Sequence, residues 1–264
     1  MSRLRRTKIN KGNQVKASKL SINSYDEEEF QSFIFDKTQQ FKNQVQDHLY
    51  KNLTISKIAG LSFVSLPLNK SKQIIDLGGG AGIDYFISRE LFDICQQWKC
   101  LETEAMCRVM IDKKLKEDNL QFDTLANFLQ YTKLELNFSL YTNSALQYFE
   151  NPINVLDSLL LKGPKKVAII RTPFVLEGSK LSTQQKSKFS KNGPQVGELS
   201  DNKKDISNFV TIERLENIKK VFQQHNYEIV CENTAVGSFT HQSKFLRPRK
   251  SLIRTVDLLA WRMN

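Results

Sequence analysis

The spacing of apolar residues changes character at about residue 71. From there to residue 240, short apolar runs alternate with stretches in which apolar positions recur every three or four residues. This alternation is typical of strand–helix–strand units, which build a mostly parallel sheet with helices on both faces. The pattern predicts an α/β domain over residues 71–240, with a twisted sheet of about seven strands. The predicted strands are 73–77, 98–102, 120–123, 136–142, 167–171, 227–232 and one near 236–239, and the predicted helices include 83–96, 105–115, 153–161 and 211–225.

The segments outside this alternation have other patterns. Residues 1–23 are polar and basic and have neither a helical nor a strand period, so we expect a flexible arm. Residues 24–70 open with a serine and a run of acidic residues, followed by apolar residues at helical spacing, which predicts an N-terminal helical cap whose first helix runs to about residue 49. Residues 178–208 are rich in lysine and serine and predict a mobile loop, and residues 241–264 predict a basic C-terminal tail.

Positive charge is concentrated in the same outer segments. The chain of 264 residues is 40% hydrophobic and 25% charged, an ordinary globular composition, and its formal net charge is +11. Residues 1–20 contain seven basic and no acidic residues, residues 178–206 six basic and three acidic, and residues 241–264 six basic and one acidic. The rest of the chain is therefore mildly acidic. This distribution disfavours a nucleic-acid partner and favours peripheral contact of the basic segments with an anionic membrane.

The sequence carries no signal for a membrane span or a metal site. No stretch approaches 18 consecutive apolar residues, and no apolar segment follows the basic N-terminus, so we expect neither a spanning helix nor a signal peptide. The four cysteines, Cys95, Cys100, Cys107 and Cys231, lack the Cys-x-x-Cys spacing of zinc and redox sites. We therefore expect a cytoplasmic protein with reduced cysteines that serve packing, and no metal.

A glycine-rich turn follows the first predicted strand. Residues 74–82 read IIDLGGGAG, so an apolar strand enters glycines that open a helix. A Walker A loop would need Gly-Lys-Ser/Thr after its last glycine, and a dinucleotide-binding turn would need Gly-x-Gly-x-x-Gly. The sequence fits neither pattern. The turn therefore either binds a different ligand or has a purely structural role. An acid two residues before the first glycine is the arrangement of Rossmann-like class I methyltransferases, which use S-adenosylmethionine (SAM). A carboxylate would repel a pyrophosphate but attracts the cationic SAM. We expect SAM to contact Asp76, Gly78, Gly79, Gly80 and Gly82.

Polar residues at the ends of the next strands extend the predicted cofactor site. Glu102 ends the second strand, where a carboxylate accepts the ribose hydroxyls in such sheets. A solvated strand-end acid is the alternative interpretation of Glu102, and Glu104 competes for the same role. Asp123 ends the third strand and is placed to reach the adenine amino group. Asn143 and Ser144 follow the fourth strand and are expected to face the cofactor.

The acceptor side of the predicted crevice depends on residues after the fourth and fifth strands. Gln147 and Tyr148 follow the fourth strand, and Arg171 follows four apolar residues of the fifth. The Arg171 guanidinium could clamp an anionic acceptor bidentately, or it could pair with Glu102 or Glu104. Enzymes that methylate exocyclic base amines place an Asn/Asp-Pro-Pro-aromatic tetrad after the fourth strand, and the chain has none there, which further disfavours a nucleic-acid substrate.

Several longer segments resemble one family of SAM-dependent methyltransferases, which is associated with bacterial surface-polysaccharide gene clusters. The segments that carry the resemblance are Tyr25-Asp26, Asp76–Gly82 with Tyr85-Phe86, Trp98–Glu102, Ser144–Tyr148 with Pro152, and Arg171–Phe174. The resemblance covers roughly residues 25–232. It implies the class I methyltransferase fold, SAM as cofactor and a role in a saccharide pathway. We expect a saccharide or sugar-linked acceptor, with Arg171 and Thr172 on the acceptor side of the crevice. After Phe174 the chain departs from the family, because residues 179–208 are polar and lysine-rich where the family carries aromatic residues over the active site.

Methyl transfer is an in-line displacement, so the enzyme mainly aligns nucleophile, methyl group and sulfur, and it removes a proton when the acceptor is a hydroxyl. The candidate bases are His241, Asp84 and Tyr85, whereas we expect His48 on a solvated helix surface and His225 as a helix cap. The resulting prediction is O-methylation of a glycan or of a nucleotide- or lipid-linked sugar. The alternatives are a catalytically idle SAM-fold scaffold whose basic arms bind a membrane or polyanion, and an RNA methyltransferase.

Overall fold

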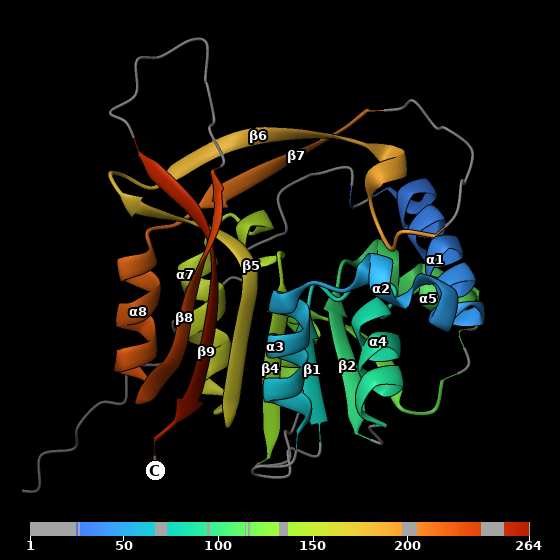
Figure 1. Ribbon diagram of the computed structural model, residues 1–264, viewed down its shortest axis with the longest axis horizontal. Helices are drawn as coiled ribbons and strands as arrows, with labels where there is room; N and C mark the ends of the chain where they lie inside the picture. The colour runs from blue at the N-terminus through green and yellow to red at the C-terminus, as the bar shows by residue number, and fades with distance from the viewer. Residues whose placement is uncertain are drawn as a thin grey trace, which may run out of the picture.

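The computed structural model describes residue 25 and residues 27–263, except 67–72, 94–95, 114, 116, 132–136, 197–204 and 239–250. The predicted basic arm at residues 1–23 and the candidate base His241 lie outside the described residues. The described part forms a seven-stranded sheet flanked by helices, and a two-stranded sheet arches over its upper edge (Figure 1).

The main sheet has the strand order β3-β2-β1-β4-β5-β9-β8. Strands β1 to β5 are parallel to one another, and β9 runs antiparallel to both of its neighbours, β5 and β8. The strands are β1 (Gln73–Leu77), β2 (Gln97–Glu102), β3 (Leu120–Thr124), β4 (Phe138–Asn143), β5 (Lys166–Glu177), β8 (Tyr227–Ser238) and β9 (Leu252–Arg262). This is the order of the Rossmann-like class I methyltransferase fold, so the predicted fold class is confirmed. The order reverses at β1, between β2 and β4, and open α/β sheets bind ligands at this point.

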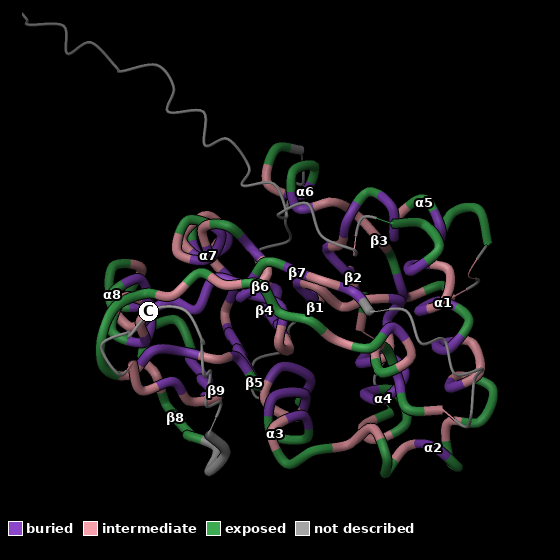
Figure 2. The backbone as a smooth tube through the Cα atoms, turned by 90° about the horizontal axis from the view of Figure 1, so that it is seen from above, coloured by how far each residue is buried: buried purple, intermediate pink, exposed green. Residues whose placement is uncertain are grey.

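Helices cover both faces of the sheet (Figure 2). On one face lie α3 (Ile55–Ser65) and α4 (Ile83–Phe92), and on the other lie α6 (Leu125–Tyr131), α7 (Pro152–Leu161) and α8 (Leu215–Gln224). Each face has its own buried apolar cluster, with Phe86 and Trp98 in the first and Phe128, Leu156 and Phe222 in the second. Because both faces are covered, the central strands consist of nearly continuous apolar runs, which is why their positions were predictable.

The N-terminal cap consists of three helices rather than a first helix that reaches residue 49. Helix α1 (Glu28–Asn43) packs on α5 (Glu104–Asp112) and ends where Gln44 leaves helical geometry, with φ of −133° and ψ of 40°. The short helix α2 (Val45–Asn52) follows. Helix α3 begins after Thr54, whose hydroxyl caps it by accepting the backbone N–H of Lys57 at 3.1 Å. Helix α3 packs on β4 and β5, whereas α1 and α2 pack on other helices.

The predicted mobile loop at residues 178–208 contains regular structure, so that prediction was wrong. Strand β6 (Leu181–Lys188) pairs antiparallel with β7 (Asp205–Ile212), and the 3-10 helix η3 (Phe189–Lys191) follows β6. Most side chains of β6 are exposed, so its sequence lacks the apolar residues that would indicate a strand. Backbone pairing, which composition does not reveal, holds this ribbon together.

The predicted basic tail at residues 241–264 contains β9, a strand inside the main sheet, so the prediction was wrong for the described residues of that segment. Residues 256–260 of β9 are all buried between β5 and β8. Leu258, Leu259 and Ala260 form a short apolar run, which indicates an interior strand. The basic residues of the same segment favoured a tail instead. Strand β8 runs to Ser238, so the two strands predicted at 227–232 and near 236–239 form one strand.

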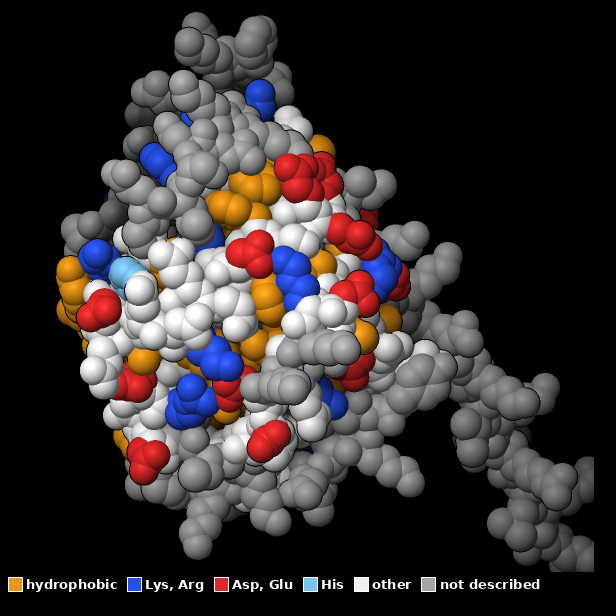
Figure 3. Space-filling model, turned by 90° about the vertical axis from the view of Figure 1, so that its right-hand side faces the viewer, with side chains coloured by type: hydrophobic (Ala, Val, Ile, Leu, Met, Phe, Trp, Pro, Cys, Tyr) orange, Lys and Arg blue, Asp and Glu red, His pale blue; other side chains and the backbone are white. Residues whose placement is uncertain are grey.

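Opposite charges alternate on the face that α1, α2, α4 and α5 form (Figure 3). Ion pairs on this face join α1 to the segment after α5, with Lys42 and Glu117 at 2.6 Å and Lys113 and Asp36 at 2.7 Å. Over the described ranges, no helix is both long and apolar enough to cross a membrane.

Cys231 is exposed, which contradicts the packing role predicted for it.

Candidate functional site

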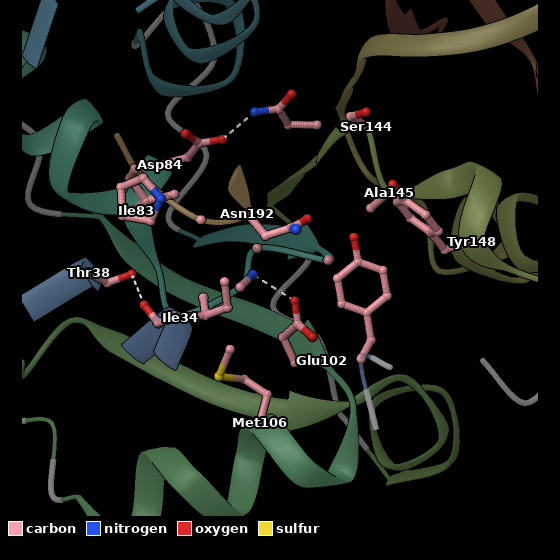
Figure 4. Close-up of a pocket in the computed structure, with 18 of the residues that line it drawn as sticks. Ile34, Thr38, Ile83, Asp84, Glu102, Met106, Ser144, Ala145, Tyr148 and Asn192 are labelled. Atoms are coloured by element: carbon pink, nitrogen blue, oxygen red, sulfur yellow. Dashed lines mark hydrogen bonds between the residues drawn. The ribbon is translucent and has the colours of Figure 1, made fainter. Parts of the chain in front are cut away.

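A cavity of about 460 Å³ lies where the parallel strands end. The sheet contributes the turn after β1, the end of β2, the residues after β4, and one residue of β5. The other walls come from α1, the α2–α3 junction, the start of α4 and of α5, the 3-10 helix η2 (Leu146–Tyr148) and residues 191–195. We call residues 189–195, which follow β6 and pass over this cavity, the strap. Figure 4 shows how side chains from these separate elements converge on one space.

The turn after β1 has the tight geometry that its glycines predict. Gly78, Gly80 and Gly82 have φ angles of +74°, +58° and +86°, a region that residues with a side chain rarely adopt. A Cβ atom on Gly79 would lie 2.4 Å from Oδ2 of Asp76, so the turn presses against the sheet. A Cβ atom on Gly80 would meet only Ile34, at 3.9 Å. The turn is therefore closed toward the sheet and open toward the cavity.

Glu102, at the end of β2, presents its carboxylate beside this turn. Its Oε1 accepts the backbone N–H of Gly80 at 2.6 Å (Figure 4). Its Oε2 accepts the backbone N–H of Thr103 at 3.1 Å. Burial raises the pKa of Glu102, and the two backbone hydrogen bonds oppose that rise. The competing candidate, Glu104, has a side chain that is 82% exposed and does not line the cavity. The geometry therefore favours Glu102 over Glu104.

Asp76 lies under the glycine turn and not in the cavity lining. It is 1% exposed, and its Oδ2 accepts the indole N–H of Trp98 at 3.2 Å. Burial and the nearby Asp84 raise the pKa of Asp76 well above its usual range. Asp76 thus supports the turn from below, and the carboxylates that reach the cavity are those of Asp84 and Glu102.

A buried ion pair forms part of the cavity wall. Nζ of Lys57 lies 2.7 Å from Oδ1 of Asp84, and both residues are buried. The other oxygen of Asp84 accepts the Tyr141 hydroxyl at 3.0 Å and Nδ2 of Asn143 at 2.8 Å. Burial alone would raise the pKa of Asp84, but the Lys57 ammonium and these hydrogen bonds outweigh it and lower the pKa. Both carboxylate oxygens are engaged, so the structure places this candidate base in an ion pair.

The same network fixes the orientation of Asn143. Because its amide nitrogen donates to Asp84, its Oδ1 faces the other way. That oxygen is buried and has no hydrogen-bond partner among the described residues. Buried polar atoms are nearly always paired, so this unpaired acceptor, on a residue that lines the cavity, is a candidate partner for a ligand that donates a hydrogen bond.

Two residues that line the cavity, one directly after β4 and one in β5, have strained backbones. Ser144 and Arg171 are not glycines, yet both have left-handed backbones with φ of +56° and +52°. The N–H of Ser144 donates to the carbonyl of Ile170 at 3.0 Å, which joins the two positions. Such conformations cost free energy and persist where the surrounding structure enforces them, often at functional sites.

The predicted site residues separate into two groups. Those that line the cavity are Gly78, Gly79, Gly80, Asp84, Glu102, Asn143, Ser144, Tyr148 and Arg171. Those that lie outside its lining are Asp76, Gly82, Tyr85, Asp123, Gln147 and Thr172.

Contacts elsewhere account for most of the second group. Asp123 lies 4.0 Å from the ammonium of Lys99, and Tyr85 packs against the ring of Trp98. Gln147 donates to a backbone carbonyl at 2.7 Å, and the hydroxyl of Thr172 does so at 3.1 Å. These side chains contact other protein groups next to the cavity and do not line it.

The two described histidines lie outside the cavity lining. His225 ends α8, as predicted for a cap, and its Nε2 lies 2.8 Å from Asp157. His48 is only 8% exposed, so the prediction of a solvated position was wrong. No group of three or more His, Cys, Asp or Glu side chains in the described ranges is arranged to hold a metal ion.

Sequence reasoning missed Lys57 and the strap. Lys57 is the only charged residue of α3, and a lone charge in an otherwise apolar helix was the available signal for a buried partner. The strap gave no such signal. Nζ of Lys37 donates to the carbonyls of Ser190 and Asn192 at 3.2 and 2.7 Å, so α1 holds the strap through backbone atoms.

No protein-family model matches the sequence, and no curated protein matches it. Among solved structures, the chain is similar to a glycopeptide N-methyltransferase, MtfA, complexed with SAM (8% identity, 74% of this chain and 83% of that chain, TM-score 0.45). It is similar to 1,6-didemethyltoxoflavin-N1-methyltransferase from Burkholderia thailandensis (8% identity, 89% and 90% of the chains, TM-score 0.46). It is also similar to the [4+2]-cyclase SpnF (11% identity, 79% of each chain, TM-score 0.47).

Proposed function

We propose that the chain is a SAM-dependent methyltransferase. The observation that carries the proposal is the carboxylate of Glu102 at the end of β2, beside a glycine turn that is open toward the same cavity. A strand-end carboxylate suits the two ribose hydroxyls of a nucleoside, and the open backbone lets a ligand approach closely.

The other polar groups of the cavity fit the rest of SAM. The unpaired Oδ1 of Asn143 can accept a hydrogen bond from the ammonium of its methionine part. The cavity volume of about 460 Å³ is within the range of small-molecule sites. Ile34 and Met106 supply apolar surface on the Glu102 side (Figure 4). Each part of the cofactor thus has a counterpart of suitable chemistry.

When bound, SAM supplies an activated methyl group on a sulfonium. The residues of this chain bind, orient and enclose the reactants. Glu102 and the glycine turn fix one end of the cofactor, and the Lys57–Asp84 pair holds Asn143 toward the other. The strap contributes residues 191–195 to the wall of the cavity. Holding the reacting atoms in line is the main source of acceleration in such a displacement.

Calorimetric titration with SAM tests this proposal, with Glu104→Ala as the matched control for Glu102→Ala. Loss of two charge-assisted hydrogen bonds should weaken SAM binding on the order of 100-fold in Glu102→Ala. The exposed Glu104 carboxylate should be dispensable. The proposal fails if the wild-type chain does not bind SAM, or if the two variants bind it equally well.

For the acceptor we propose a glycan or a nucleotide- or lipid-linked sugar. Support comes from the resemblance to the polysaccharide-associated family and from the polar side chains that line the cavity beyond Asn143. These are Thr54, Ser144, Tyr148, Asn192 and Gln195, whose polar groups are of the kind that bind sugar hydroxyls.

Radioactive SAM separates this acceptor from the alternatives. We expect label in a pool of nucleotide- and lipid-linked sugars and none in total RNA. Label in RNA would indicate an RNA methyltransferase instead. SAM binding without any transfer would indicate an idle scaffold, and either result contradicts the proposed acceptor.

A further inference from the structure

The charged side chains that line the cavity are unevenly distributed. The described lining contains four cationic side chains, Lys51, Lys57, Arg171 and Lys191, and two carboxylates, Asp84 and Glu102. The Lys57–Asp84 pair neutralises one charge of each sign, and Glu102 is engaged by backbone N–H groups on the cofactor side. The remaining cations have no carboxylate partner in the described part of the chain.

Arg171 is the best placed of these cations. Arg171 is exposed, it lines the cavity, and no hydrogen bond or ion pair engages its guanidinium within the described ranges. The guanidinium is close enough to act on the buried hydroxyl of Tyr141. Burial raises the pKa of that hydroxyl well above its usual range, and Arg171 opposes the rise.

A bulge in β5 places Arg171 at the cavity. The register of β5 against β9 shifts between Ile169 and Thr172, and Arg171 occupies this irregularity with φ of +52°. Oδ1 of the buried Asp257, on β9, accepts the backbone N–H of Arg171 at 2.7 Å. Bulges re-aim a side chain and are frequent next to active sites. The fold maintains a strained conformation that directs this one side chain.

The strap brings Lys191 to the same cavity. Asn52, in the α2–α3 region, fastens it in two places, because its Nδ2 donates to the carbonyl of Gln195 at 2.9 Å and its Oδ1 accepts the N–H of Gln195 at 2.7 Å. Lys37 holds the strap from α1. Hydrogen bonds from Lys37 and Asn52 therefore fix the backbone on both sides of Lys191.

We propose that Arg171, with Lys191 and Lys51, forms a subsite that binds the diphosphate of a sugar-linked acceptor. The inference rests on the proposed function, since it names the acceptor class of the same site. A guanidinium binds phosphate oxygens bidentately and ammonium groups add charge, so three unpaired cations match a diphosphate diester. Nucleotide-linked and lipid-linked sugars share this diphosphate, and the subsite recognises that common group.

The test measures binding of inorganic pyrophosphate to the full chain saturated with S-adenosylhomocysteine. Arg171→Gln should weaken pyrophosphate binding at least about tenfold and Lys191→Gln several-fold. Lys186→Gln is the matched control, because this exposed lysine of β6 makes the same charge change outside the cavity lining. Retained SAM binding by each variant shows that it is folded.

Two further arms identify the source of the diphosphate. A uridine diphosphate sugar and a short-chain prenyl diphosphate sugar should each compete with pyrophosphate if they occupy the subsite, and the stronger competitor indicates the natural source. The free sugar should compete far less. Equal pyrophosphate binding by Arg171→Gln and Lys186→Gln, or no binding by the wild-type chain, overturns the subsite. Failure of SAM binding instead overturns the proposed function, so the two failures are distinguishable.

Discussion

The two ends of the cavity differ in charge. They also differ in how far apart in the sequence their residues lie. The end at Glu102, which we propose binds SAM and call the cofactor end, combines a carboxylate with backbone N–H groups and comes mainly from residues 78–106. The other end, which we propose binds the acceptor and call the acceptor end, is cationic, and its residues come from α2, β5 and the strap. Local sequence is enough to specify the first end, because strand, turn and helix follow one another. The second end exists only after distant segments have packed.

The largest expected effect comes from the ion pair between these two ends. Lys57→Met leaves the buried carboxylate of Asp84 uncompensated, which should lower the free energy of unfolding by about 3–5 kcal/mol at pH 7. The folded-state pKa of Asp84 is lowered, so its contribution is present above the usual carboxylate pKa and is lost as pH falls through the lowered value. Denaturant unfolding at pH 7 and below pH 4 measures both effects.

The double variant Lys57→Met/Asp84→Asn is the control for that prediction. Removing both charges should restore part of the lost stability, because no unpaired charge stays buried. A cost below about 1 kcal/mol for Lys57→Met would contradict a buried, structurally required pair.

Substitutions at two neighbouring glycines distinguish the side of the turn that faces the sheet from the side that faces the cavity. Gly79→Ala places a methyl group against Asp76 and should destabilise the fold by about 2 kcal/mol. A methyl group on Gly80 has room, so Gly80→Ala should lower the free energy of unfolding by only about 1 kcal/mol, the cost of the left-handed backbone. The methyl group points into the cavity, however, so Gly80→Ala should weaken SAM binding more than Gly79→Ala does. Denaturant unfolding and SAM calorimetry on both variants check this. Equal effects on SAM would contradict the assignment of the two sides.

The acceptor end should respond to a residue that does not line the cavity. Asp257→Ala removes the acceptor of the Arg171 N–H, so we expect a stability loss of about 1.5 kcal/mol and weaker pyrophosphate binding. SAM binding should change little, because the cofactor end does not involve β9. Unchanged pyrophosphate binding in a folded Asp257→Ala chain would show that the bulge does not position Arg171.

The smallest expected effect is a gain in stability. The folded-state pKa of Asp76 is raised, so its favourable contribution is complete below the usual aspartate pKa and is lost as pH rises through the raised value. Asp76→Asn keeps an acceptor for Trp98 without the ionisation, and should raise the free energy of unfolding at pH 7 by about 1 kcal/mol. The gain should vanish below pH 4. Lower stability at pH 7 would show that the ionised form is the favoured one.

The difference between the two ends also explains how much the sequence could predict. The parallel strands and Glu102 were predictable, because burial on both faces produces apolar runs and a strand end fixes the position of the next residue. Asp123 was placed by the same rule, but it lies near Lys99 and outside the cavity lining, which no local pattern reveals. Strand β6 and the strap are held by backbone bonds and by Lys37, contacts that leave no trace in composition.

The position of β9 has a consequence for synthesis. The ribosome makes this strand after all the others described here, yet β9 inserts between β5 and β8. Domains begin to fold from the N-terminal side while they are made, so the half of the sheet around β1 can form while β5 still lacks a neighbour. Asp257 arrives with β9, and only then can the Arg171 bulge close. A nascent chain would thus acquire its cofactor end before its acceptor end.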